Sequence, residues 1–158
     1  MRTGKVIIID YKEHIREMLC RFLPKMGFSC VSSSNSIHAT QLASTFKPDI
    51  AIVDIDLPEM DGFEVVKSLR KNLPELKTIF MYDRADFNST MSALNLRVNS
   101  FFQRPLDLDK LLLTLTKMDH QISEKKREEI KKNQIAAEYS RLRIMYSICL
   151  HLYLQKAG

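Results

Sequence analysis

The sequence predicts a doubly wound α/β fold, in which helices cover both faces of a parallel β-sheet. Between residues 1 and 119, short apolar runs alternate with stretches whose apolar residues recur at helical spacing. The most strongly apolar of these runs have apolar residues at consecutive positions, as expected of parallel strands buried on both faces. Strands that alternate with helices imply right-handed crossovers within one sheet.

The first strand and the first helix have the clearest patterns. Residues 6–9 are a continuous apolar run that ends at Asp10. Apolar residues then recur every three or four positions, which predicts a helix, and Pro24 with Gly27 indicates where it ends. The apolar face of this helix consists of Ile15, Met18, Leu19, Phe22 and Leu23.

The later elements continue the alternation. Residues 49–53 form a second strongly apolar run, which ends at Asp54. Asp107 is expected to cap the last helix. The other expected strands are residues 28–31, 78–82 and 100–103, and the other expected helices are residues 36–46, a stretch lined by Phe63, Val66 and Leu69, residues 88–97, and a long helix from residue 108.

Residues 120–158 differ in character from the domain over residues 1–119. The charged stretch SEKKREEIKK contains no Gly or Pro, so it is expected to extend the last helix and not to form a flexible linker. After it, apolar residues recur at alternating steps of four and three, like the seam of a coiled coil. The seam residues are Ile135, Tyr139, Leu142, Tyr146, Cys149 and Tyr153.

The end of this helical extension is apolar on nearly every face. Residues 144–154 read IMYSICLHLYL, which is too short to cross a bilayer because a spanning helix needs roughly 20 residues. An apolar stretch of this kind is expected to be buried against a partner. We expect a homodimer through a helical bundle, with packing on the same domain or attachment at a membrane surface as alternatives.

Charge and cysteine content narrow the functional classes. Residues 1–119 hold 16 Lys and Arg against 15 Asp and Glu, a net charge of +1, whereas residues 120–158 hold 8 against 4, a net charge of +4. A basic nucleic-acid surface on the main domain is therefore not supported. The three cysteines show no metal-type spacing and fit a reducing compartment, so we expect a cytoplasmic protein. The start, MRTGKVIIID, has only four consecutive apolar residues before a carboxylate, so we expect no export signal.

Four polar residues follow predicted strands directly. They are Asp10, Asp54, Asp83 and Arg104. In doubly wound sheets, ligands bind beyond the carboxyl ends of the strands, where the strand order reverses. The sequence therefore predicts a functional site formed by these four residues.

The motif around Asp54 makes a resemblance specific. Residues 54–62 read DIDLPEMDG, an example of D-x-D-L-P-x-M-D-G between a strand and a helix. Together with Asp10 and with Arg104 and Pro105 after the last strand, this motif resembles the bacterial response regulator receiver family over residues 5 to about 119. The resemblance implies a flavodoxin-like (βα)5 domain with a five-stranded sheet. It also implies that Asp54 accepts a phosphoryl group from a histidine kinase or a phosphotransfer protein.

The family also uses a bound magnesium ion, and the chemistry explains why. Attack by a carboxylate on a phosphoryl group brings two anions together, and a hard divalent cation offsets that repulsion. By the resemblance, the ligands would be Asp54, Asp10 (directly or through water) and the main-chain carbonyl of Asp56. Family members bind the phosphoryl group with a hydroxyl after strand four and a lysine after strand five. An aromatic residue on strand five, here Phe101, then moves inward.

The sequence departs from this pattern at three positions. Tyr11 stands where the family has a second acidic residue, which should weaken magnesium binding. Asp83 replaces the hydroxyl residue and would repel a phosphoryl group. Arg104 replaces the lysine, and its planar guanidinium suits carboxylates, so we expect it to bridge Asp54 and Asp83 without phosphate. This bridge would hold the arrangement that phosphate induces in relatives, or it is a partly buried ion pair with no net effect on stability.

These observations favour signal reception in a two-component pathway, with output through protein–protein contacts to a downstream partner or an effector domain. The chain is then either a stand-alone regulator or a fragment that ends before its effector. The first alternative is a pseudo-receiver, an interaction module that never carries phosphate. The second is a small enzyme that uses the carboxylates for metal-assisted hydrolysis. No substrate-binding loop supports the enzyme, so we expect no enzymatic activity.

Overall fold

The computed structural model describes residues 4–84 and 95–157. The chain divides into two compact units, Met1–Asp119 and His120–Gly158, and each is described separately. The first unit contains the strands β1 (Lys5–Ile9), β2 (Ser29–Ser33), β3 (Ile50–Asp54), β4 (Lys77–Tyr82) and β5 (Ser100–Gln103). Its helices are α1 (Glu13–Lys25), α2 (Ser36–Phe46), α3 (Gly62–Asn72) and the first turns of α5 (Leu108–Lys156).

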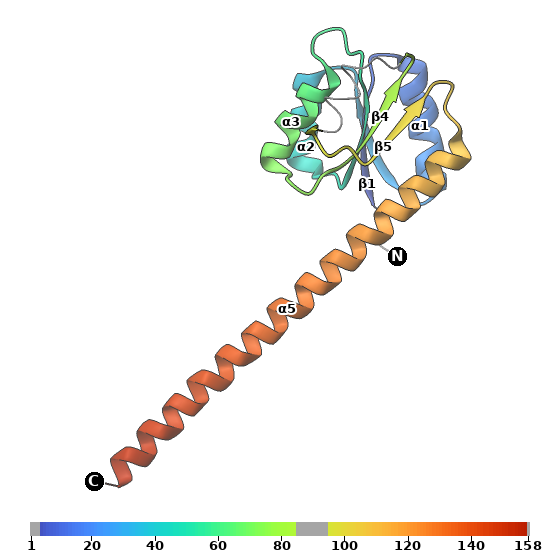
Figure 1. The fold of residues 1–158 in the computed structure, drawn as a ribbon. Helices are drawn as coiled ribbons and strands as arrows, with labels where there is room; N and C mark the ends of the chain where they lie inside the picture. Colours follow the sequence, from blue (N-terminus) through green and yellow to red (C-terminus); the bar gives the residue numbers. More distant parts are fainter. Residues whose placement is uncertain (1–3, 85–94, 158) are drawn as a thin grey trace. The chain divides into compact units, whose positions relative to one another are not determined.

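The five strands form one parallel sheet in the order β2-β1-β3-β4-β5. Helices α2 and α3 lie on one side of this sheet, and α1 and the start of α5 lie on the other (Figure 1). This topology confirms the predicted flavodoxin-like fold. Because the chain leaves β1 toward β2 and returns to β3 on the other side of β1, the strand order reverses between β1 and β3, which places a ligand site at their carboxyl ends.

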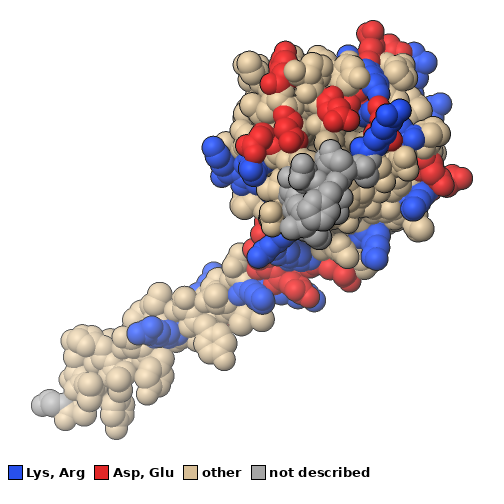
Figure 2. Space-filling view, turned by 45° about the horizontal axis from the view of Figure 1, so that its top comes forward, with Lys and Arg blue, Asp and Glu red and all other residues tan. Residues whose placement is uncertain are grey.

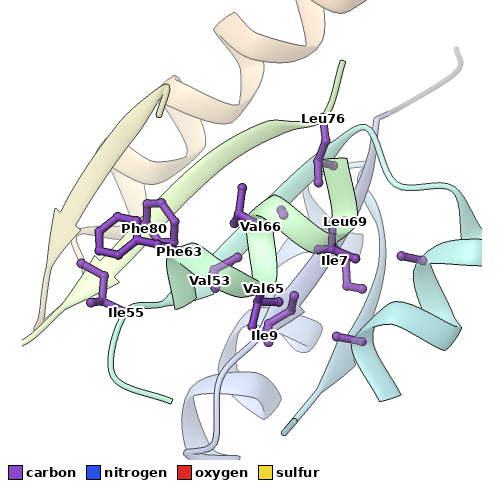
Figure 3. Packing of buried hydrophobic residues seen from close by; sticks show 13 residues of the cluster. Ile7, Ile9, Val53, Ile55, Phe63, Val65, Val66, Leu69, Leu76 and Phe80 are labelled. Carbon is purple, nitrogen blue, oxygen red and sulfur yellow. The ribbon is translucent and has the colours of Figure 1, made fainter. Parts of the chain in front are cut away.

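The strands are buried because both faces of the sheet are covered. Every residue of β3 is buried, and four of the five residues of β1 are. On the face covered by α2 and α3, the ring of Phe63 packs 4.5 Å from that of Phe80 between their centroids (Figure 3). Leu111 and Leu115 anchor the first turns of α5 and are fully buried. The core therefore fixes the strand ends that carry the site.

Several element boundaries differ from the expected ones. β2 covers Ser29–Ser33 in place of the expected residues 28–31, because it pairs along the whole length of β1. Pro24 lies within the last turn of α1, and Gly27 follows with a φ of 89°, a left-handed conformation that favours glycine. The predicted cap of α5 is confirmed, since Asp107 accepts a hydrogen bond from the Lys110 N–H at 3.0 Å. The helix expected at residues 88–97 falls mostly outside the described residues.

The second unit is helical throughout the part that the structure describes. Helix α5 continues without a break to Lys156, as the charged stretch predicts, and residues 124–157 are all exposed. Lys, Arg, Asp and Glu are absent from residues 144–155, and the end of the helix accordingly shows few charged side chains in Figure 2. Among the described helices, none is long and apolar enough to cross a membrane.

Candidate functional site

The site lies at the carboxyl ends of four strands of the sheet. Asp10 follows β1, Asp54 is the last residue of β3, Asp83 follows β4 and Arg104 follows β5. The structure brings all four side chains together in one network of ion pairs. We call these residues, with Lys12, the ion-pair cluster.

Two carboxylates at the base of the cluster are completely buried. Asp10 and Asp54 are each 0% exposed. One oxygen of each is held by the loop that follows it, since Asp10 Oδ1 accepts the Lys12 N–H at 2.8 Å and Asp54 Oδ1 accepts the Asp56 N–H at 3.2 Å. Because burial penalises a free charge, the two remaining oxygens need a cation nearby.

Arg104 supplies that cation. Its Nη2 lies 3.0 Å from Asp10 Oδ2 and 2.9 Å from Asp54 Oδ2, and its side chain is only 8% exposed. The contact with Asp10 is a hydrogen bond, whereas the contact with Asp54 is an ion pair without hydrogen-bond geometry. The expected bridge from Arg104 to Asp54 and Asp83 is therefore present, and Arg104 also holds Asp10.

Asp83 joins the cluster at its exposed edge. It accepts a hydrogen bond from Arg104 Nη1 at 3.2 Å and another from Lys12 Nζ at 2.9 Å, while its own side chain is 51% exposed. Sequence reasoning missed Lys12. The only signal in the sequence was its position two residues after Asp10. In the structure, Arg16 holds this loop by donating a hydrogen bond to the Asp10 carbonyl oxygen at 2.7 Å.

The pKa values of these groups follow from burial and charge. Burial raises the pKa of Asp10 above its ordinary 3.8, and the negative charge of Asp54 adds to the rise. Burial would lower the pKa of Arg104, but its close contact with Asp54 and the charges of the three carboxylates outweigh burial and raise that pKa. The hydrogen bond from Lys12 lowers the pKa of Asp83. Arg104 thus stays charged at any physiological pH.

Three further predicted residues lie at the rim of the site. Tyr11 is 43% exposed, with Lys12 Nζ 5.5 Å from the centre of its ring. Asp56 is exposed, and partial burial and the charge of Asp54 raise its pKa. The ring of Phe101 stacks 5.9 Å from that of Phe80, yet Phe101 remains 39% exposed. Phe101 is thus partly exposed beside the buried Phe80, and its role as a switch residue stays a prediction.

The loop after Asp54 depends on a glycine. A Cβ atom on Gly62 would lie 2.3 Å from the Asp54 carbonyl oxygen, which is backbone and cannot turn aside. Gly62 also donates its N–H to the Ile55 carbonyl oxygen at 3.0 Å. Gly62 therefore lets the start of α3 approach the end of β3, which fixes the backbone of Asp54.

Replacing Gly62 by Ala is expected to destabilise the receiver unit by about 1–3 kcal/mol, the usual cost of overpacking. Urea unfolding of the full chain measures this loss. The matched control is Gly4→Ala, whose Cβ would meet the Asp119 Oδ1 atom at 2.6 Å, a side-chain end that can move. Equal stability of the two variants would contradict the proposed role of Gly62.

The chain matches the family model described as "Response regulator receiver domain" over residues 6–116. The regulatory protein AtoC of Escherichia coli is 29% identical over 110 residues, which are 70% of this chain and 24% of that protein. The sporulation initiation phosphotransferase F of Bacillus subtilis is 24% identical over 111 residues, 70% of this chain and 90% of that protein. This chain thus aligns with about a quarter of AtoC and with most of the Bacillus protein.

Solved structures have the same fold. The chemotaxis protein CheY4 of Vibrio cholerae matches with a TM-score of 0.69 at 22% identity, over 74% of this chain and 99% of that one. A CheY-like receiver domain protein of Methanospirillum hungatei JF-1 matches with a TM-score of 0.72 at 22% identity, over 78% and 99%. With the strand order, the D-x-D-L-P-x-M-D-G loop and the family match over most of its length, the chain belongs to the response regulator receiver domain family.

Proposed function

We propose that this receiver domain accepts a phosphoryl group on Asp54 and passes the signal on through protein–protein contacts. The observation that carries the proposal is the state of Asp54 Oδ2. This oxygen is buried at the end of β3 and, within the described residues, receives no hydrogen bond. Asp54 Oδ1 is held by the Asp56 N–H, whereas Asp54 Oδ2 has the ion-pair contact with Arg104 Nη2 at 2.9 Å, so Oδ2 is the oxygen that can attack once Arg104 gives way.

The proposed transfer is a simple displacement at phosphorus. Asp54 Oδ2 forms a bond to phosphorus, the bond from phosphorus to the donor breaks, and the donor keeps that electron pair. Positive charge must offset the approach of two anions. Arg104 and Lys12 supply it, while the carboxylate of Asp83 opposes the approach. The donor would be a histidine kinase or a phosphotransfer protein, and the free thiols of the chain suit a reducing cytoplasm.

The test is the intact mass of the full chain after incubation with a small-molecule phosphodonor and magnesium. We expect one phosphoryl adduct, stable in acid and labile in base, that is lost in Asp54→Asn. Asp56→Asn is the matched control, because it removes a neighbouring carboxylate outside the ion-pair cluster and should still be labelled. If the folded chain carries no adduct while a conventional receiver is labelled alongside, the proposal is wrong.

One observation favours a second candidate function, a pseudo-receiver that signals without phosphate. Asp54 is 0% exposed and pairs with the nearly buried Arg104, so a donor could reach it only after Arg104 moves aside. A permanently closed pocket would present one surface to a partner at all times. The absence of an adduct in the same mass measurement would favour this function over phosphotransfer.

We further propose that the helical extension joins two copies of the chain. The six seam residues all lie on the exposed helix of the second unit, and Leu142 and Tyr146 are 57% and 71% exposed. Their steps of four and three match the repeat by which two helices bury a shared stripe. Signal output would then pass from β5, Phe101 and the start of α5 to a partner or effector that is held as a pair.

A further inference from the structure

The position of Arg104 determines which cation offsets the negative charges of the two buried carboxylates, independently of phosphotransfer. Receiver domains generally bind magnesium at this pocket. Here Arg104 Nη2 already lies between Asp10 and Asp54, at 3.0 and 2.9 Å from one oxygen of each. These distances are those of charge-assisted contacts, so the guanidinium is in direct contact with both carboxylates.

The residues present do not fit a magnesium ion while Arg104 holds this position. Each oxygen of Asp10 and Asp54 has a nitrogen neighbour within 3.2 Å, from Lys12, Asp56 or Arg104. Magnesium requires near-ideal octahedral oxygen coordination. Among the residues that the structure describes, no group of three or more His, Cys, Asp or Glu is arranged to hold a metal ion. Tyr11 also offers no carboxylate at the position next to Asp10.

A guanidinium suits this position better than the ammonium group of a lysine would. Its planar fork reaches several carboxylates at once, and Arg104 uses Nη2 for Asp10 and Asp54 and Nη1 for Asp83. Lys12 holds the outer oxygen of Asp83 at 2.9 Å, which supports the fork from the solvent side. The cation is therefore fixed by three carboxylates that come from β1, β3 and the end of β4.

We propose that the guanidinium of Arg104 is a built-in cation that takes the place of the divalent ion in this pocket. The carboxylates of Asp10 and Asp54 then bind no magnesium while Arg104 is seated between them. Removing the guanidinium should open a cation site that the natural chain lacks. This inference stands apart from phosphotransfer, and both of its readouts are taken without a phosphodonor.

The first readout is the melting temperature of the full chain by calorimetry, in magnesium chloride and in sodium chloride of equal ionic strength. We expect no difference for the natural chain. For Arg104→Ser we expect magnesium to raise the melting temperature of the receiver unit by about 4 °C or more, because a ligand that binds only the folded state stabilises it. Lys117→Ser makes the same change of charge at an exposed position away from the cluster, and it should behave like the natural chain.

The second readout keeps the test valid if Arg104→Ser does not fold. The amide N–H groups of Lys12 and Asp56 donate to the two carboxylates, so their NMR signals report on a bound ion. In the natural chain these signals should not shift with magnesium, whereas in Arg104→Lys, which lacks the fork, they should shift and saturate. The inference is overturned if magnesium shifts them in the natural chain as strongly as in Arg104→Lys. It is also overturned if Arg104→Lys, or a folded Arg104→Ser, shows no response to magnesium.

Discussion

Replacing Arg104 by Met is expected to lower the free energy of unfolding of the receiver unit by about 3–5 kcal/mol, the usual cost of removing one partner from a buried ion pair. Met keeps the stem of Arg104 as far as the position of Nε, so the substitution removes chiefly the guanidinium and its charge. Without the guanidinium, Asp10 and Asp54 are two completely buried carboxylates that face each other with no cation between them. This is the largest change in stability that we expect from a single substitution in the cluster.

The loss should depend on pH in a direction set by Asp10. Its pKa is raised in the folded domain, chiefly by burial, so between the unfolded and the folded pKa the folded state binds more protons than the unfolded chain. Such a group favours folding below its unfolded pKa of 3.8, and that contribution disappears as the pH rises through the folded pKa. Removing Arg104 raises the folded pKa further. The deficit of Arg104→Met should therefore be largest near neutral pH and shrink on acidification.

Urea unfolding at neutral and mildly acidic pH, followed by the amide NMR signals of the strands, measures this effect. Those signals report on the sheet alone and not on the helical extension. Arg104→Lys keeps a positive charge and should lose less stability, and Lys117→Met controls for removing an exposed cation. A loss by Arg104→Met no larger than that of Lys117→Met, or a deficit that does not change with pH, would show that the cluster does not depend on Arg104.

Replacing Leu142 by Glu is expected to convert the full chain from a dimer into a monomer. Burying one apolar side chain of this size contributes roughly 1.5–3 kcal/mol. The substitution acts twice in a dimer, so association should weaken by about 10²–10⁴-fold. The new carboxylates would also face each other across the seam, where like charges repel.

Sedimentation velocity of the 18.4 kDa chain separates these states. The matched control is Ile130→Glu, which introduces the same charge on the same helix outside both the seam and residues 144–154, at an apolar side chain that is 56% exposed against 57% for Leu142. We expect a dimer for the natural chain and for Ile130→Glu, and a monomer for Leu142→Glu and for residues 1–119 alone. A monomeric natural chain, or dissociation of Ile130→Glu alone, would refute the proposed seam.

The sequence was sufficient to predict that four strand-end residues meet at the site, because the carboxyl ends of parallel strands lie at one edge of the sheet. Asp10, Asp54, Asp83 and Arg104 each follow an apolar run, and β1 and β3 are adjacent in the sheet. The continuous helix through SEKKREEIKK was equally predictable, since the stretch has no residue that would end a helix. In both cases the course of the backbone, which the sequence pattern indicates, determines where the residues lie.

The partners of the charged side chains were harder to predict. The sequence indicated that Arg104 would reach Asp54 and Asp83, but not that its Nη2 would also contact Asp10. Lys12 was missed because its reach to Asp83 depends on the path of the loop between β1 and α1. Phe101 is 39% exposed and Phe102 is buried, on the edge strand β5, and which of these neighbouring aromatic rings enters the core was not predicted from the sequence. Side-chain reach and loop path are properties of the folded chain that spacing alone does not determine.

A crystal structure of the full chain, grown in magnesium, would test the position of Arg104 most directly. We predict that Arg104 Nη2 remains in contact with both buried carboxylates, near the 3.0 and 2.9 Å that separate it from Asp10 and Asp54. No ion should lie between the two carboxylates. A hydrated magnesium ion on Asp10 and Asp54, with Arg104 turned out to solvent, would contradict the account of this pocket.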